Sequence, residues 1–243
     1  MISASTNIIE GSRFEAGQDI SGREPKIMVC KGRTAPHACG GDTIYEGLLY
    51  EAKRLNIPVI IEHAKCGCSG ACLKGPFLSL PHLGLFYHQV KEAHLPVILK
   101  ETVLKGKILF PLLHLNPLQS IRGDLIWEKA GNCIMAMDNS YCMVQTAEYL
   151  INFHADESCG KCTPCRLGIN QLKDLIARIV RGEAPEDAVL QMESLIWLAG
   201  QAAYCAFAGK AAHIILAVLS NFREEFEIHV REKRCPAGAC KII

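Results

Sequence analysis

The chain is organised around the stretch Glu157-Ser158-Cys159-Gly160-Lys161-Cys162-Thr163-Pro164-Cys165-Arg166. Its three cysteines have C-x2-C-x2-C spacing, which cannot place all three on one face of a helix, so we expect them to surround a centre held over a loop. Iron–sulfur clusters are bound in this way, with a fourth cysteine supplied from elsewhere in the sequence. The remote candidate is Cys205, which follows a helical run and precedes Ala206-Phe207-Ala208-Gly209. The pattern therefore predicts a tetrathiolate iron–sulfur site.

Two other uses of these cysteines compete with this prediction. Zinc also binds four thiolates, but structural zinc sites usually contain two C-x2-C pairs, whereas this stretch has a triple spacing with Pro164 beside the third thiol. Disulfides are disfavoured further, because the first residues of the sequence do not resemble an export signal. We therefore favour iron over zinc at this site.

Composition limits the partners and the compartment. The 26 basic residues nearly balance the 25 acidic ones among 243 residues, so nothing indicates a nucleic-acid or anionic-membrane partner. The apolar runs are too short for direct membrane insertion, although 49% of the residues are hydrophobic, which favours surface buried against other subunits. Thirteen cysteines without an export signal indicate metal or redox chemistry in a reducing cytoplasm.

The first half of the chain is predicted to be an α/β unit. Residues 1–24 have no sustained period and are interpreted as an extension, and order is expected to begin at Lys26-Ile27-Met28-Val29. Asp42 is a candidate cap for the helix that follows, and a second strand, Val59-Ile60-Ile61, leads into a loop with three cysteines at residues 66–72. The size of the chain allows this unit to be one of two domains.

The order strand, helix, strand favours a right-handed crossover and parallel pairing. Both cysteine loops then leave the carboxyl ends of neighbouring strands, where open α/β sheets place their sites. Residues 77–80 and 85–90 are interpreted as a hairpin, and residues 93–105 as a closing helix. Four thiols are therefore expected to meet at one edge of the sheet.

The cysteine pattern of this half resembles the thioredoxin-like 2Fe-2S ferredoxins, which also occur as a subunit or an amino-terminal domain of NADH-oxidising complexes. The resemblance is carried by Val29-Cys30, by Cys39 after eight further residues, and by Cys68-x3-Cys72-Leu73-Lys74-Gly75-Pro76. It implies a thioredoxin-like fold for residues 25–116 and a 2Fe-2S cluster bound by Cys30, Cys39, Cys68 and Cys72. Cys66 is an alternative to Cys39 as the second ligand, although the family pattern makes it a bystander.

The second half of the chain is predicted to be helical. Residues 117–141 have mixed polarity and no clear period, so they are interpreted as a linker, with Ser140 as the candidate cap of a helix over residues 143–153. A further helix is expected after Cys165, with Gly182 as its stop. Two more are expected, one that begins at Pro185-Glu186-Asp187 and one that contains Ile215, Val218, Leu219, Phe222 and Phe226.

Residues 144–240 resemble the carboxyl-terminal iron–sulfur region of the flavin-bearing NADH-oxidising subunit of respiratory complex I. They are more similar still to the beta subunits of electron-bifurcating hydrogenases and NAD-linked formate dehydrogenases. The residues that carry the resemblance are Glu157 to Arg166, Cys205, and Arg231-Glu232-Lys233-Arg234-Cys235-Pro236-Ala237-Gly238-Ala239-Cys240.

This second resemblance implies a small helical bundle over residues 142–231. The bundle would bind a 4Fe-4S cluster through Cys159, Cys162, Cys165 and Cys205. The predicted fold class is therefore α/β plus all-α: a thioredoxin-like 2Fe-2S ferredoxin domain followed by a helical bundle that holds the second cluster.

The tail, residues 232–243, carries a C-x4-C pair. His229, Cys235 and Cys240 are three soft ligands at close spacing, which suffice for a zinc site if a fourth joins, and Cys142 is the candidate. Alternatively, the tail thiols are unligated and the histidine caps the helix end, or the tail helps to hold a cluster in a longer homologue. Cys133 is interpreted as an ordinary buried or loop cysteine.

An internal absence shapes the functional hypothesis. In the flavin-bearing relatives a flavin and NADH domain separates the two iron–sulfur regions, but residues 117–142 are far too short for it, and no G-x-G-x-x-G occurs. We therefore expect no FMN and no catalysis by the chain alone. The chain is predicted to relay electrons between partner subunits, either flavoproteins or other iron–sulfur proteins, of a cytoplasmic hydrogenase-, formate dehydrogenase- or complex I-like oxidoreductase.

Two functional alternatives remain open at this point. The first is an NADH dehydrogenase-type subunit that uses a flavin from a partner chain. The second is a scaffold without redox chemistry, with zinc at the cysteine sites.

Overall fold

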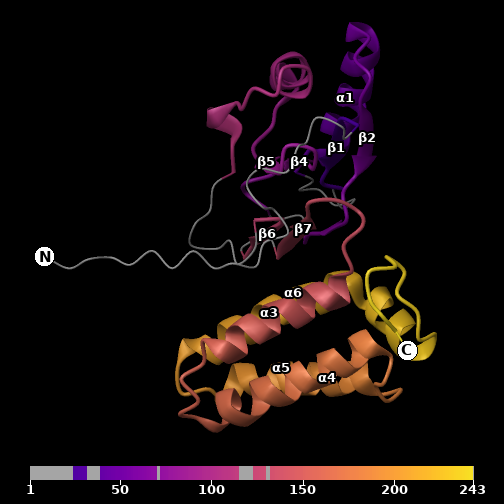
Figure 1. Cartoon of the computed structure of the whole chain (residues 1–243). Coiled ribbons are helices and arrows are strands. Elements are labelled where there is room, and N and C mark those ends of the chain that lie inside the picture. The colour runs from indigo at the N-terminus through magenta and orange to yellow at the C-terminus, as the bar shows by residue number, and fades with distance from the viewer. Residues whose placement is uncertain (1–23, 32–38, 70–71, 115–122, 130–131, 243) are drawn as a thin grey trace, which may run out of the picture.

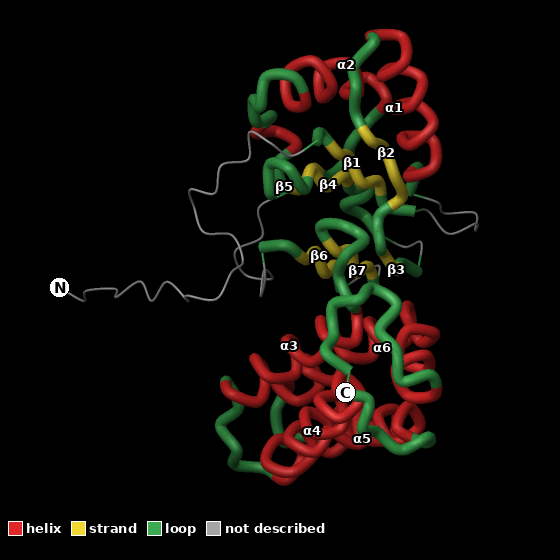
Figure 2. Tube along the Cα trace, turned by 45° about the vertical axis from the view of Figure 1, so that its right-hand side comes forward, coloured by secondary structure: helices red, strands yellow, loops and turns green. Residues whose placement is uncertain are grey.

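The computed structural model of the chain describes residues 24–31, 39–69, 72–114, 123–129 and 132–242. The predicted extension over residues 1–24 lies outside the described residues, apart from residue 24. Figures 1 and 2 show two regions: an α/β region built by the first half of the chain, and a helical region built by the second half.

The α/β region contains the predicted strand, helix, strand unit. Its four-stranded sheet has the order β2-β1-β4-β5, with β1 and β2 parallel and the other neighbours antiparallel. The parallel pair and the antiparallel β4–β5 hairpin are both confirmed. The elements are β1 (Lys26–Val29), α1 (Gly41–Leu55), β2 (Ile60–His63), β4 (Leu78–Leu80) and β5 (Leu85–Tyr87).

Helix α1 begins one residue earlier than its predicted cap. Gly40 is the N-cap, in a left-handed conformation with φ 76° that suits glycine, and Asp42 lies in the first turn, where its charge favours the helix dipole. The buried residues Ile44, Leu48 and Ala52 recur at helical spacing and pack against the sheet.

The closing helix over residues 93–105 is present, but it is irregular. It begins as a 3-10 turn, η1 (Glu92–His94), continues through α2 (Leu95–Val97) and ends as a π-helix, η2 (Ile98–Val103). Its buried side chains share one core with α1 and the sheet. A further 3-10 turn, η3 (Phe110–Leu112), follows. The α/β half therefore has a complete hydrophobic core of its own.

The segment interpreted as a linker contains an ordered hairpin, which corrects that part of the prediction. Strands β6 (Leu125–Glu128) and β7 (Cys133–Ala136) are antiparallel, and β7 also pairs with the short strand β3 (Cys66–Gly67). The two faces of this second sheet belong to different cores. Leu125, Ile134 and Ala136 pack into the core of the helical region, whereas Ile126, Cys133 and Met135 pack against the cysteine-rich end of the α/β region.

The helical region is the predicted bundle. It consists of α3 (Met143–Asp156), the π-helix η4 (Pro164–Ile169), α4 (Asn170–Arg181), α5 (Ala188–Ala202) and α6 (Ala206–Arg231). Helix α4 ends at Gly182 in a left-handed conformation, as expected. The cap of α3 is Cys142 and not Ser140, because the Cys142 Sγ accepts a hydrogen bond from the backbone N–H of Gln145 at 3.5 Å. The predicted fold class, α/β followed by a helical bundle, is confirmed.

Helix α6 joins the two regions. At its middle it packs on β3 so closely that a Cβ added to Gly67 would lie 2.1 Å from the Cβ of Asn221. One turn later Glu225 forms an ion pair with Lys65 (2.5 Å) and accepts a hydrogen bond from the backbone N–H of Met143 (3.1 Å). Glycine at position 67 is therefore what permits this approach.

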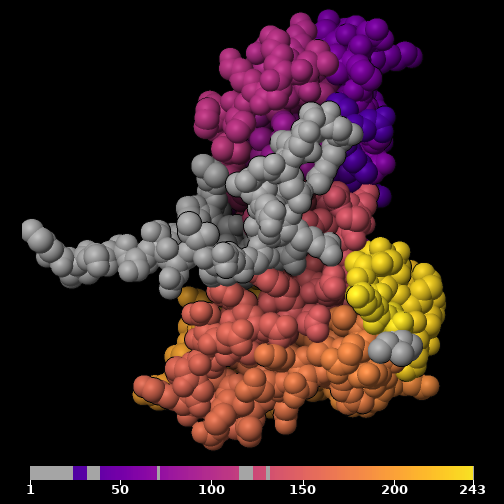
Figure 3. Space-filling view, in the orientation of Figure 1, coloured from indigo at the N-terminus to yellow at the C-terminus, as the bar shows by residue number. Residues whose placement is uncertain are grey.

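The tail packs on the helical region, where the yellow residues of Figure 3 cover its side. Lys233 Nζ donates to the carbonyl of Gly182 at 2.5 Å, and a Cβ at Gly182 would meet the Ile242 side chain. None of the helices in the described part of the chain combines the length and the apolar composition that a membrane span requires.

Candidate metal centres

The cysteines of the α/β region gather at one end of its sheet. Cys30 directly follows β1, and Cys68 directly follows β3; both are buried. Together with Cys39 and Cys72 they lie in one hydrophobic cluster, whose other members include Phe77 and the β6–β7 hairpin. The structure thus brings together all four of the thiols that the sequence predicts for the 2Fe-2S cluster.

These four thiols form two pairs. The thiols of Cys30 and Cys39 share a hydrogen bond, as do those of Cys68 and Cys72. Gly75 lies between the pairs, since a Cβ built on it would be 3.3 Å from the Cys39 Sγ and 3.4 Å from the Cys72 Sγ. A 2Fe-2S cluster takes two thiolates on each iron, so two adjacent pairs in an apolar pocket fit this group.

Backbone N–H groups point at the sulfur atoms of this pocket. Phe77 donates to the Cys30 Sγ at 3.2 Å, Gly41 donates to Cys39, and Lys74 and Gly75 donate to Cys72. The hydrogen bond from Cys30 lowers the pKa of Cys39 to about 6, despite the opposing effect of burial. Such donors favour thiolates, and they are among the features that set cluster potentials.

Cys66 has a different environment. Its Sγ accepts a hydrogen bond from the backbone N–H of Lys31 at 3.1 Å, and burial raises its pKa to about 11. Cys39, in contrast, shares a hydrogen bond with Cys30. This geometry favours Cys39 over Cys66 as the partner of Cys30.

Cys133 is buried, but it is not an isolated core residue. Its thiol is hydrogen-bonded to both Cys68 and Cys72, and these contacts, the Cys68 contact first, together with burial, raise its pKa strongly. Spacing alone gives no sign of this contact, because Cys133 lies more than sixty residues from Cys72 and belongs to the hairpin that the sequence presents as a linker.

The second cysteine group surrounds the loop between α3 and η4. Cys162 and Cys165 share a hydrogen bond, and Cys205 lies close enough to Cys165 to affect its pKa. Cys205 is the N-cap residue of α6, and the backbone N–H of its neighbour Tyr204 donates to the Cys162 sulfur, which is the first cause of the lowered pKa of Cys162. The chain thus brings one remote thiol to the C-x2-C-x2-C loop, as predicted.

The fourth thiol of this group, Cys159, is exposed at the start of the loop, next to Gly160 in a left-handed conformation with φ 64°. Cys205 is also exposed, whereas Cys165 is buried. This site is therefore open toward its surroundings on the Cys159 side.

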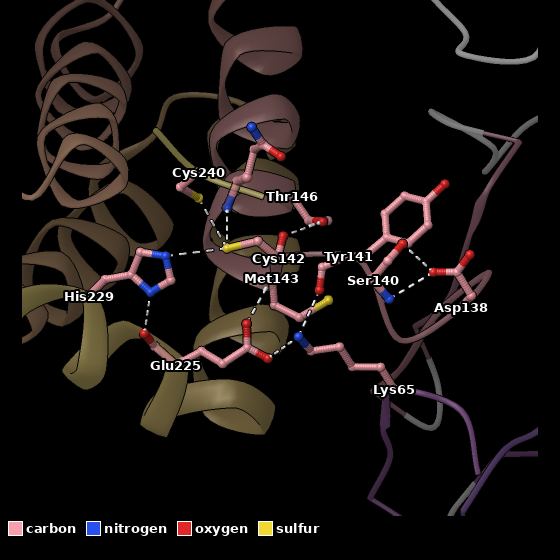
Figure 4. Close-up of polar contacts among 11 residues, drawn as sticks. Lys65, Asp138, Ser140, Tyr141, Cys142, Met143, Thr146, Glu225, His229 and Cys240 are labelled. Carbon is pink, nitrogen blue, oxygen red and sulfur yellow. Dashed lines mark hydrogen bonds and ion pairs between the residues drawn. The ribbon is translucent and has the colours of Figure 1, made fainter. Parts of the chain in front are cut away.

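The third group consists of Cys142, His229, Cys235 and Cys240, whose ligand atoms all lie within 4.8 Å of one another. Figure 4 shows the Cys142 Sγ facing the His229 Nε2 at 3.4 Å and the Cys240 Sγ at 3.5 Å. The His229 Nδ1 is bonded to the carbonyl of Glu225 at 2.7 Å, which leaves Nε2 directed at the sulfur atoms. Three cysteines and one histidine in this arrangement match a closed structural zinc site.

The electrostatics of this group favour a charged pair. The hydrogen bond from Cys240, helped by His229, lowers the pKa of Cys142 to about 4. Burial opposes the charge on His229, but its hydrogen bonds to Cys142 and to the Glu225 carbonyl raise its pKa to about 9. Without a metal, Cys142 is thus a thiolate between an imidazolium and a thiol. A cation that replaced these protons would find its ligands already assembled.

Known protein families match the second half of the chain. Residues 145–229 match the family described as the NADH-ubiquinone oxidoreductase-F iron-sulfur binding region. This match includes the Cys159 loop, Cys205 and His229, whereas Cys142 precedes it and Cys235 and Cys240 follow it.

Two curated relatives illustrate the similarity. The chain is 36% identical over 107 residues to the NADP-reducing hydrogenase subunit HndC of Solidesulfovibrio fructosivorans, which covers 44% of this chain and 22% of that protein. It is 32% identical over 180 residues to an F-type subunit, numbered F 2, of the NADH-quinone oxidoreductase of Rhizobium meliloti, which covers 69% of this chain and 42% of that protein. The chain thus spans less than half the length of these relatives.

Solved structures give partial matches to each region. A NAD+-reducing [NiFe]-hydrogenase matches 40% of this chain and 17% of its own length, with 26% identity and a TM-score of 0.38. A thioredoxin-like [2Fe-2S] ferredoxin from Aquifex aeolicus matches 37% of this chain and 89% of its own length, with 20% identity and a TM-score of 0.30. The predicted resemblance is confirmed by the sequence relatives: this chain is related to the F-type subunits of NADH-quinone oxidoreductases and to a hydrogenase subunit, and residues 145–229 are its iron–sulfur binding region.

Proposed function

We propose that this chain is an iron–sulfur electron-transfer subunit of a cytoplasmic, multi-subunit oxidoreductase. Cys30, Cys39, Cys68 and Cys72 would hold a 2Fe-2S cluster, and the cysteines at positions 159, 162, 165 and 205 would hold a 4Fe-4S cluster. Its partners would be flavoprotein or iron–sulfur subunits, in an assembly of the hydrogenase, formate dehydrogenase or complex I kind. When bound, the clusters would accept and release single electrons.

The observation that carries this proposal is the paired arrangement of thiols in the α/β region. Four cysteines from two separate loops meet in an apolar pocket, in two pairs, with backbone N–H groups directed at their sulfur atoms. A single zinc ion would draw its four ligands to one point, whereas a binuclear cluster needs two pairs. The match of residues 145–229 to an iron–sulfur binding region supports the second cluster independently.

The proposal assigns no flavin or nucleotide site to this chain. The segment between the two proposed cluster regions contains the β6–β7 hairpin, and its described residues, 123–129 and 132–141, pack between the two cores. The glycine-containing loops of the α/β region already position cysteines. Electrons would therefore enter and leave through cofactors of partner subunits.

We further propose that Cys142, His229, Cys235 and Cys240 hold a structural zinc ion. The ion would fasten the tail to the start of α3 and to the end of α6, three segments that are far apart in sequence. Its role would be to stabilise the fold, because four protein ligands leave no open coordination position for a substrate.

Anaerobic purification of the full chain tests these assignments together. We expect a brown protein with about six iron atoms and one zinc ion per chain, without bound flavin and without NADH oxidation. A colourless protein with zinc at every cysteine site would support the scaffold alternative. Stoichiometric flavin and NADH oxidation by the isolated chain would contradict the relay.

The remaining alternative, an NADH dehydrogenase-type subunit that uses a partner's flavin, is distinguished in the native assembly. We expect the flavin to remain with another subunit, in its own binding domain, when the assembly is dissociated. Flavin held between this chain and a partner, and lost from both on dissociation, would favour that alternative.

A further inference from the structure

Cys133 occupies an unusual position for a structural cysteine. It is the first residue of β7, its side chain is 2% exposed, and its thiol is hydrogen-bonded to Cys68 and to Cys72. Its neighbours on the same face are Ile126, Met135 and Phe77, all buried. The only described polar side-chain groups that it contacts in this cluster are therefore the two thiols of one proposed ligand pair.

The chemistry of the pocket decides what such a thiol can do. If Cys68 and Cys72 bind iron, their sulfur atoms are negatively charged acceptors. A further thiolate beside them, buried in an apolar environment, would be strongly disfavoured, so the Cys133 thiol keeps its proton. A protonated thiol is a weak hydrogen-bond donor, and the nearest acceptors are the sulfur atoms of the pair.

We propose that Cys133 is a positioning residue for the 2Fe-2S cluster, whose S–H donates a hydrogen bond to a ligand sulfur of the Cys68–Cys72 pair. This inference rests on the proposed function of that pocket. A donor to a cluster sulfur stabilises the reduced state, which carries one more negative charge, and thus raises the reduction potential.

The position of Cys133 gives this role a structural consequence. Its strand pairs with β3, which directly precedes Cys68, and the opposite face of the same hairpin packs into the helical core. The register of β7 against β3 therefore fixes how the donor meets the cluster. The connection between the two regions thereby contributes to setting the potential of the first cluster.

Two nearly isosteric variants of the full chain test the proposal. Cys133→Val fills similar volume without a donor, and Cys133→Ser replaces the thiol by a hydroxyl that donates. Met135→Leu, in the same cluster and without polar change, is the control for repacking. The readouts are iron content, the electron paramagnetic resonance (EPR) spectrum of the reduced cluster, and its potential from a redox titration monitored by EPR.

We expect all three variants to keep the cluster. The Cys133→Val potential should shift to more negative values by about tenfold in the reduction equilibrium, which is about 59 mV for a one-electron couple. The Cys133→Ser and Met135→Leu potentials should stay within a fraction of that shift from the unchanged chain.

Three results would overturn the proposal. An unchanged potential in Cys133→Val would mean that the thiol donates nothing to the cluster. Loss of about two irons from Cys133→Val, with an altered spectrum in Cys133→Ser, would make Cys133 a ligand itself. Equal shifts in Cys133→Val and Met135→Leu would assign the effect to packing. Absence of a 2Fe-2S signal from the unchanged chain would instead refute the proposed function on which the inference rests.

Discussion

Helix α6 has a candidate metal ligand near each of its ends, and the two sites differ in how completely the fold assembles them. Near its C-terminal end, His229 meets three cysteines in a buried group whose ligand atoms lie within 4.8 Å. At its start, Cys205 meets a loop from which Cys159 remains exposed. The first arrangement suits one small ion, and the second suits a larger group whose ligands must stand apart.

This difference indicates different relations between metal and fold. At the Cys142–His229 site the tail is fastened by its ligands, so the ion should contribute to the stability of the whole helical region. At the Cys159 loop most ligands lie on a surface segment, so loss of the cluster should leave the bundle folded. Substitutions at the two sites test this contrast.

The largest expected effect is the loss of one whole cluster. Cys165→Ser should remove about four of the six irons, because Cys165 is the buried member of the loop group, while the 2Fe-2S signal and the helical content remain. Iron analysis, EPR and circular dichroism measure these three quantities.

Cys66→Ser is the matched control for that substitution, since it removes a thiol outside both proposed ligand sets. Full iron content is expected. Loss of two irons from Cys66→Ser would show that Cys66 replaces Cys39, and retention of all iron in Cys165→Ser would contradict the second ligand set.

The next effect is on zinc affinity and stability. Cys142→Ser should weaken zinc binding by roughly a hundredfold or more, because a preassembled thiolate is replaced by a hydroxyl. The thermal midpoint of the helical region should fall with it, whereas Cys165→Ser should leave that midpoint nearly unchanged. Chelator competition and calorimetry measure the two effects. Equal midpoints for both variants would remove the contrast between the sites.

Zinc affinity should also depend on pH. The pKa of His229 is raised to about 9, and the pKa of Cys240 is raised by its hydrogen bond to the Cys142 thiolate, so both groups hold protons near neutrality. Zinc must displace both protons, so apparent affinity should rise with pH, by roughly a hundredfold per unit below pH 9. Competition experiments at several pH values measure the slope, and an affinity independent of pH would contradict this ligand set.

The smallest effect concerns the junction between the two regions. Gly67→Ala places a Cβ against the Asn221 Cβ, which neither backbone can avoid without moving, and should destabilise the chain by about 1–3 kcal/mol. Gly200→Ala is the control, because nothing lies within 4 Å of its added Cβ and the substitution favours the helix. Denaturant unfolding compares them, and an equal stability for both variants would refute the close packing of α6 on β3.

Much of this architecture can be predicted because its signals are local. The apolar run before Cys30, the helical spacing of Ile44, Leu48 and Ala52, and the glycine at position 182 each report on neighbours within one or two turns. The spacing of the cysteines in the second half indicates a loop and a remote ligand. The soft-ligand count of the tail also points to Cys142, nearly ninety residues from His229, and the fold brings the two within 3.4 Å.

The β6–β7 hairpin escapes prediction for a physical reason. Strands with one wet face alternate polar and apolar residues, but β7 is buried on both faces, between two cores, and β6 over half its length, so no alternation is visible. The available signal is the apolar run Cys133-Ile134-Met135-Ala136-Met137 after Gly131-Asn132, a dipeptide typical of tight hairpins. The contact of Cys133 with Cys68 and Cys72 follows from that hairpin and cannot be read from spacing.

The central claim is that two iron–sulfur clusters of different size occupy one chain. Mössbauer spectroscopy of the full chain, purified anaerobically with enriched iron, tests it most directly. The account predicts two sets of signals in a ratio of about two irons to four, and two paramagnetic centres after reduction. A single set of signals, or fewer than about six irons per chain in fully loaded protein, would contradict it.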